Sequence, residues 1–243
     1  MPRGPLADGG AIPWSKPPNA VERGPFMDRE LKHDVVILGA GLAGLRAAVE
    51  ISRRLGGRVD IGIVSKVQLM RAHSVCAEGG TAAVLRTDLG DSTELHAWDT
   101  VKGSDFLADQ DVVRTFVDTI PKEIRQLDHW GIPWTRDAEG YIAQRPFGGH
   151  SYPRATLAAD KTGFFEMQTL YDQLQRYRTF TRYDEFFVTD ILVEGGRFAG
   201  LVGLHTGTGE TVAIRGKALL IASGGGGTLY GFTTYSQTVT GDG

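Results

Sequence analysis

The sequence predicts an α/β fold, a parallel sheet flanked by helices with an inserted β-meander, from three observations. A short apolar run at 34–38 leads into a glycine-rich turn and then into a helical pattern. After Phe186 the hydrophobic period changes to two, which is typical of antiparallel strands. Another apolar run, 217–222, leads into a glycine cluster. The 243-residue chain is long enough to bury a real core around these elements.

The first unit is a strand, a turn, a helix and a second strand in close succession. The strand is expected at 34–38 and the helix at 42–55, followed by a second strand at 59–64. Gly56-Gly57 supplies the helix stop. Four small or apolar residues recur at spacings of three and four and define the buried helix face: Leu45, Ala48, Val49 and Ser52.

The middle of the chain is expected to be mainly helical. The polar stretch 65–81 has no period and is predicted to be a long, ordered loop. Pro121 suits a first helical position, so it is expected to begin a new helix. Helices are predicted at 92–102, 111–119, 121–130 and 162–177, with a small hairpin within 132–143 and a loop at 148–160.

The last third of the sequence predicts the β-meander and one more buried strand. Strands are expected near 186–193, 198–205 and 210–215, because glycine-bearing turns separate them. The strand at 217–222 is wholly apolar after its lysine. Residues 1–32 are rich in proline, glycine and charge, and are predicted to be a flexible extension that precedes one domain at 33–243.

Composition excludes several classes of function. The net charge of −3 gives no reason to expect nucleic acid as a partner. The longest apolar runs are too short to span a bilayer, so no direct membrane insertion is expected. The single cysteine, Cys76, excludes a disulfide within the chain and a cysteine-based metal site.

The turn after the first strand carries the GxGxxG pattern of a dinucleotide site. Its residues are Gly39, Ala40, Gly41, Leu42, Ala43 and Gly44. The first glycine permits the tight turn, the second lets the backbone approach a pyrophosphate, and the third lets helix and strand pack closely. The acid that usually binds the ribose hydroxyls is replaced by Ser65-Lys66, which argues against NAD as the resident cofactor.

The loop Arg71-Ala72-His73-Ser74-Val75-Cys76-Ala77-Glu78-Gly79-Gly80 resembles the flavin loop of fumarate reductase and succinate dehydrogenase flavoproteins. The resemblance continues over nearly all of 33–243, through segments that include 96–101, 110–113, 130–134, 147–149, 158–163, 184–188 and 240–243. It implies a Rossmann-like FAD-binding domain with a β-meander insertion, and FAD bonded covalently through His73.

The same resemblance implies the remaining cofactor contacts. The loop residues Ser74, Glu78, Gly79 and Gly80 lie by the flavin, and Ser65 and Lys66 approach the adenosine side. Val188 lies beside the adenine through its backbone, Ser223, Gly224 and Gly225 close over the cofactor, and Asp242 reaches it. Phe147 matches a phenylalanine that lines the dicarboxylate site. From the residues alone, an ordinary core role for Val188 and a solvated turn for Asp242 are favoured, whereas Phe147 is equally consistent with a core role and with a place in the dicarboxylate site.

The implied activity is the interconversion of succinate and fumarate, with electrons passing to or from an iron–sulfur subunit and quinone. The flavoprotein would lie on the cytoplasmic side of the inner (plasma) membrane, held there through partner and membrane anchor subunits. The chain stops within the family's Thr-Gly-Asp-Gly motif. The family's substrate-binding histidines and threonine, proton-shuttling arginine, capping domain and C-terminal helical domain are expected beyond it, so no catalytic residue is assigned within this chain.

The sequence leaves two alternative functions open. One is a soluble FAD oxidoreductase of the L-aspartate oxidase type, which lacks the histidine. The other is a fragment that binds FAD without catalysis. Either way, the truncated chain by itself is expected to lack fumarate reductase activity.

Overall fold

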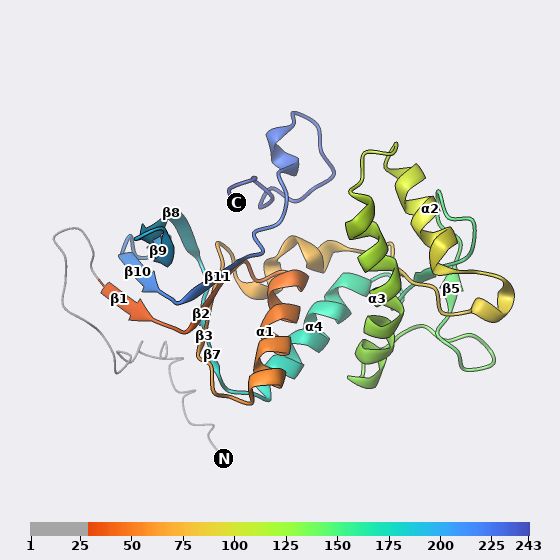
Figure 1. Ribbon diagram of the computed structural model, residues 1–243, viewed down its shortest axis with the longest axis horizontal. Helices are drawn as coiled ribbons and strands as arrows, with labels where there is room; N and C mark the ends of the chain where they lie inside the picture. The colour runs from red at the N-terminus through yellow and green to blue at the C-terminus, as the bar shows by residue number, and fades with distance from the viewer. Residues whose placement is uncertain (1–28) are drawn as a thin grey trace, which may run out of the picture.

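The computed structural model describes residues 29–243, and a parallel sheet of four strands lies at its centre (Figure 1). The strand order is β11 (Ala218–Ile221), β2 (Val35–Leu38), β3 (Ile61–Val64) and β7 (Phe180–Tyr183). Every neighbouring pair runs parallel. Parallel neighbours need crossover connections, so this sheet confirms the α/β prediction.

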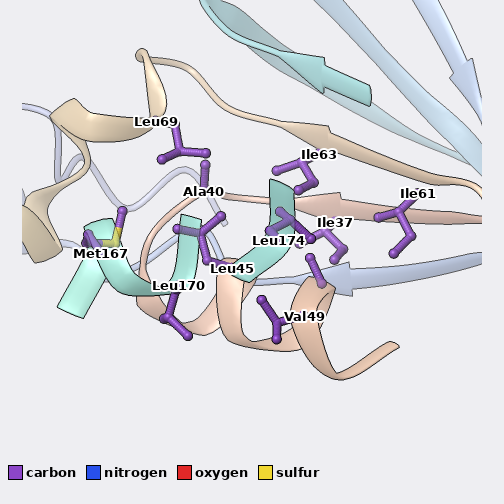
Figure 2. Packing of buried hydrophobic residues seen from close by; sticks show 11 residues of the cluster. Ile37, Ala40, Leu45, Val49, Ile61, Ile63, Leu69, Met167, Leu170 and Leu174 are labelled. Atoms are coloured by element: carbon purple, nitrogen blue, oxygen red, sulfur yellow. The ribbon is translucent and has the colours of Figure 1, made fainter. Parts of the chain in front are cut away.

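Two helices cover one face of this sheet, α1 (Leu42–Leu55) and α4 (Thr162–Gln175). Figure 2 shows how their apolar side chains meet those of the strands in the main core. Its fully buried members include Ile37, Leu45 and Leu174. Burying one such side chain contributes roughly 1.5–3 kcal/mol, so this cluster fixes the start of α1 against the sheet.

The opposite face of the central sheet packs against a second sheet, which consists of the predicted β-meander and one further strand. Its order is β1 (Arg29–Lys32), β10 (Thr211–Arg215), β9 (Arg197–His205) and β8 (Phe186–Glu194). The pairs β10–β9 and β9–β8 are antiparallel, whereas β1 runs parallel to β10. A second core fills the space between the sheets, with Val36 and Val64 facing residues such as Leu201.

Two strands differ from the prediction. Residues 29–32 were expected within the flexible extension, which is wrong: they form β1, and Leu31 is buried between the sheets. The rest of the extension, 1–28, lies outside the described residues. The edge strand β7 was not predicted. It pairs with β3 and completes the crossover through α4.

The helical region beyond α4 contains α2 (Thr93–Gly103) and α3 (Gln110–His129). The division of α3 at Pro121 is wrong, because one helix continues through the proline. A proline inside a helix removes one backbone hydrogen bond, and burial of the amphipathic face offsets that loss here: Val117 and Ile124 flank the proline and are fully buried.

A small sheet links this helical region to the rest of the chain. Its order is β4 (Thr81–Ala82), β6 (Ala155–Thr156) and β5 (Gln144–Arg145), all antiparallel. The hairpin expected at 132–143 is reduced to one bridge, between Arg136 and Ile142. Short 3₁₀ turns occupy Leu69–Arg71, His73–Cys76, Thr87–Leu89 and Gly227–Leu229.

None of the helices within 29–243 is both long and apolar enough to cross a membrane.

Candidate cofactor-binding site

A cleft of about 510 Å³ opens where β2 and β3 end and α1 begins. Its volume falls within the range of about 300–1,000 Å³ that is usual for cofactor sites. Ligands of open α/β sheets bind in this position, outside the carboxyl ends of the strands. Fourteen predicted site residues line it: Gly39, Ala40, Gly41, Leu42, Ala43, Ser65, Lys66, His73, Ser74, Val188, Ser223, Gly224, Gly225 and Asp242.

The glycine turn leaves no room for side chains. Gly39 has a φ of +114°, and a Cβ there would lie 2.1 Å from the carbonyl oxygen of Ala222. A Cβ on Gly44 would lie 2.0 Å from the carbonyl oxygen of Gly39. Gly44 therefore holds the helix against the strand and does not itself line the cleft, as the third glycine of the motif requires.

The N-terminus of α1 is open toward the cleft. Gly41 stands at the N-cap and has no side chain to cap the helix, and the first turn carries no acid. The backbone N–H of Leu42 donates to the hydroxyl oxygen of Ser74, 3.2 Å away. Because the N-terminal end of a helix carries a partial positive charge and unpaired N–H groups, this end suits a phosphate.

Lys66 and Asp242 meet at the cleft although they are far apart in sequence. The Lys66 ammonium donates to a carboxylate oxygen of Asp242 at 2.6 Å and also to the Thr240 hydroxyl. The Thr240 hydroxyl in turn donates to the same carboxylate. These hydrogen bonds, with that from Lys66 the stronger, lower the pKa of the Asp242 carboxyl below its ordinary value. The contact ties the C-terminal segment to the end of β3.

The edge strand β8 forms another wall. Phe186 through Ile191 line the cleft in succession, and Val188 is among them as predicted. A β-bulge lies between Val188 and Asp190, where Thr189 has no partner in the register with β9. An edge strand leaves a row of backbone N–H and C=O groups unpaired. These groups can form hydrogen bonds with a nucleotide base without the help of side chains.

His73 lies at another part of the cleft, beside a loop that the sequence reading did not assign to the site. Its ring centroid is 4.9 Å from that of Tyr235, and its Nδ1 accepts a hydrogen bond from the backbone N–H of Ser236 at 3.4 Å. Tyr235, Thr238 and Val239 also line the cleft. No periodicity or motif in the loop signals this role, because only the fold brings the loop to His73.

The predicted residues Glu78, Gly79, Gly80 and Phe147 are not among those that line the cleft. Glu78 is exposed, and Phe147 is about half exposed. A Cβ on Gly79 would lie 3.2 Å from the Phe147 ring, so the two pack together. These residues form a surface that continues from the His73 loop toward the small sheet.

A buried ion cluster joins helix α2 to the residue that precedes β6. Arg154, which is fully buried, forms a bidentate ion pair with Asp91 and also binds Asp99 at 2.5 Å. Asp99 accepts from the backbone N–H and the hydroxyl of Ser151 at 2.7 and 2.6 Å. Burial raises the pKa of Asp99, but the hydrogen bonds from Ser151 and Arg154 outweigh it and lower the pKa overall.

His96 lies beside this cluster, and its Nδ1 has no hydrogen-bond partner among the described residues. Burial, reinforced by the positive charge of Arg154, lowers the pKa of His96 to about 4. The side chain is therefore neutral at physiological pH. The structure gives Arg154 a structural role, as the counter-charge of Asp91 and Asp99.

The cleft fits FAD by its shape and by its donors. Gly225 lines it with open space where a Cβ would project, so the backbone there leaves room for a ligand. Gly224 adds a φ of +85° that favours glycine. The lining includes the edge strand β8, which has one neighbouring strand among the described residues, the aromatic pair of His73 and Tyr235, and the N-terminus of α1. Within residues 29–243, no group of three or more His, Cys, Asp or Glu side chains is placed to hold a metal ion.

Comparison with known proteins agrees with this geometry. The FAD binding domain family matches residues 34–243. The chain is 48% identical over 212 residues to the fumarate reductase flavoprotein subunit of Mycobacterium tuberculosis, covering 87% of this chain and 36% of that protein. The corresponding Escherichia coli subunit is 45% identical over 210 residues, covering 86% of this chain and 34% of the relative. The chain thus spans about a third of the length of these curated relatives.

Solved structures show the same fold. A quinol-fumarate reductase determined with menaquinol molecules has a TM-score of 0.81 and 44% identity, covering 88% of this chain and 36% of its own. The Mycobacterium smegmatis Sdh1 complex has a TM-score of 0.81 and 32% identity, covering 88% of this chain and 38% of its own. The chain belongs to the FAD binding domain family and resembles, within it, the flavoprotein subunits of fumarate reductase and succinate dehydrogenase.

Proposed function

We propose that this chain is the FAD-binding part of a flavoprotein that interconverts succinate and fumarate and exchanges electrons with an iron–sulfur subunit and quinone. The observation that carries the proposal is the docking of the His73 loop on the start of α1. Ser74 accepts from the N–H of Leu42, so the residue next to His73 lies beside the pyrophosphate turn. The names of the similar proteins, fumarate reductase and succinate dehydrogenase flavoprotein subunits, supply the reaction class.

The residues of the chain would bind and orient the cofactor. The N–H groups at the start of α1 would bind the pyrophosphate, and Lys66 with the β8 edge would hold the adenosine side. His73 would carry the covalent link. FAD would supply the redox chemistry, exchanging a hydride with a carbon of the dicarboxylate. Glu78 and Phe147 would face the dicarboxylate from the surface next to the cleft.

The proposed domain covers 33–243 together with β1. In the complete flavoprotein, this domain would meet membrane anchor subunits only through its partners, on the cytoplasmic side of the inner membrane. The similarity to quinol-fumarate reductase and Sdh complexes supports this arrangement.

The test is the fate of the flavin after denaturation. The protein purified with FAD is precipitated with acid, and the pellet is run on a denaturing gel and viewed for flavin fluorescence. We expect a fluorescent band for the unchanged protein and none for His73→Ala, which should still bind FAD before precipitation. Flavin found only in the supernatant would contradict the covalent link and favour an oxidoreductase of the L-aspartate oxidase type. Failure to bind FAD at all would contradict the cofactor assignment itself.

A further inference from the structure

We propose that Tyr235 and His73 together form the subsite for the flavin ring of the cofactor, an inference that rests on the FAD-binding function proposed above. The new element is Tyr235, which the chain places against His73 from a loop more than 150 residues away in sequence. The ligand chemistry that this subsite selects is a planar aromatic ring system.

The two rings lie close together on the wall of the cleft. Their centroids are 4.9 Å apart and their planes are inclined by 34°. The backbone N–H of Ser236 donates to Nδ1 of His73 at 3.4 Å, so the residue after Tyr235 also holds the histidine. Since an amide N–H only donates, Nδ1 serves as the acceptor and Nε2 stays free of this contact.

Tyr235 is held in place by two residues that do not line the cleft, Gly227 and Thr233. A Cβ on Gly227 would lie 2.6 Å from Cγ of Tyr235, so the tyrosine packs directly on the Gly227 backbone. Its own N–H donates to the hydroxyl of Thr233 at 3.1 Å. The following turn is closed by the Val239 N–H, which donates to the carbonyl of Ser236 at 3.0 Å.

Despite these anchors, Tyr235 remains 52% exposed and lines the cleft. An aromatic side chain fixed on one side and exposed on the other presents a preformed surface on which another ring can pack without loss of rotamer freedom. This exposure distinguishes it from the buried Tyr183, whose hydroxyl is hydrogen-bonded to His33.

The remaining walls of the cleft suit the other two parts of FAD, the pyrophosphate and the adenosine. The turn at 39–44 suits the pyrophosphate, because it opens the N-terminus of α1. The edge of β8 that no other described strand covers and the Lys66–Asp242 pair suit the adenosine. The wall made by His73 and Tyr235 is left for the flavin ring.

The experiment compares a ligand that contains the ring with one that lacks it. Calorimetric titrations of the 243-residue chain use 8-demethyl-FAD, which lacks the methyl carbon needed for a covalent bond, and ADP, which occupies only the pyrophosphate and adenosine sites. Stacking between aromatic rings contributes about 0.5–1.5 kcal/mol, equivalent to about 2- to 12-fold in affinity. We expect Tyr235→Ala to weaken 8-demethyl-FAD binding by this factor and to leave ADP binding unchanged.

Two further variants test whether the loss of affinity is due to the aromatic ring of Tyr235. Tyr235→Phe keeps the ring and should restore the affinity for 8-demethyl-FAD. Tyr230→Ala is the matched control, because Tyr230 is 74% exposed on the same segment and does not line the cleft. Unchanged 8-demethyl-FAD affinity in Tyr235→Ala, or an equal loss of ADP affinity, would overturn the flavin-ring subsite. An unchanged chain that binds neither ligand would instead overturn the FAD-binding function.

Discussion

Replacing Arg154 by leucine should destabilise the fold severely, because it leaves two carboxylates in the interior without their counter-charge. Arg154 is fully buried, and Asp91 and Asp99 are 8% and 7% exposed. Breaking a buried ion pair by removing one partner costs about 3–5 kcal/mol, since the remaining charge cannot be solvated. Here the remaining charges are of like sign, which places the expected loss at the upper end of that range.

The measurement is urea unfolding followed by tryptophan fluorescence. With a slope of about 2 kcal/mol per molar urea, a loss of about 5 kcal/mol lowers the unfolding midpoint by about 2.5 M. Arg114→Leu is the control, because Arg114 forms its ion pairs with Glu94 and Asp118 on the surface. That variant should unfold at nearly the unchanged midpoint.

The destabilisation caused by Arg154→Leu should also depend on pH, and it should become smaller as the pH falls. The pKa of Asp99 lies below 3.8 in the folded protein, so its contribution is present above the unfolded pKa and lost as pH falls through the folded one. The difference between Arg154→Leu and the unchanged protein should therefore shrink as pH is lowered below about 4. A midpoint within about 0.5 M of the unchanged protein at neutral pH would refute the reasoning.

The remaining predictions concern His96 and the glycine turn. The pKa of His96 is about 4 in the folded protein, below its ordinary 6.5. As the pH falls, the unfolded chain therefore binds a proton at His96 before the folded protein does. With allowance for solvent screening, the free energy of unfolding should fall by about 1–2 kcal/mol between pH 6.5 and 4. His96→Phe should flatten that profile in urea unfolding; an unchanged slope would exclude His96 as its source. Gly39→Ala should abolish FAD binding in fluorescence titrations, because its Cβ would lie 2.1 Å from the Ala222 carbonyl. Gly140→Ala, with a φ of +89° but open space, should cost about 1 kcal/mol and retain binding; a binding-competent Gly39→Ala would contradict the close-approach argument.

Much of the central fold could be predicted because its signals are local. The helix α1 begins at Leu42 and ends at Leu55 as expected, since a glycine turn precedes it and Gly56 closes it in the left-handed conformation. The strand β1 gave no such signal. Three of its four residues are charged, and only its pairing with β10 and the burial of Leu31 make it a strand. The helix α3 runs through Pro121 because tertiary burial overrides the local preference.

In the candidate site too, some features could be predicted from local motifs, whereas others depend on how the chain folds. Motif residues such as Gly41 and Ser74 could be identified individually, and the structure brings them into contact. Lys66 and Asp242 were each assigned to the cofactor, yet their ion pair with one another follows only from the chain's path. Tyr235 carries no motif at all, and its place beside His73 depends on the packing of its loop on Gly227.

One edge of β8, which pairs with no other described strand, also affects the behaviour of the protein in solution. Unpaired strand edges are templates on which chains add to one another, and natural proteins cover them or break their regularity. The bulge at Thr189 and the exposed carboxylates of Asp190 and Glu194 interrupt this edge, and a nucleotide lying along it would cover the rest. We therefore expect the cofactor-free chain to aggregate more readily than the FAD-loaded one.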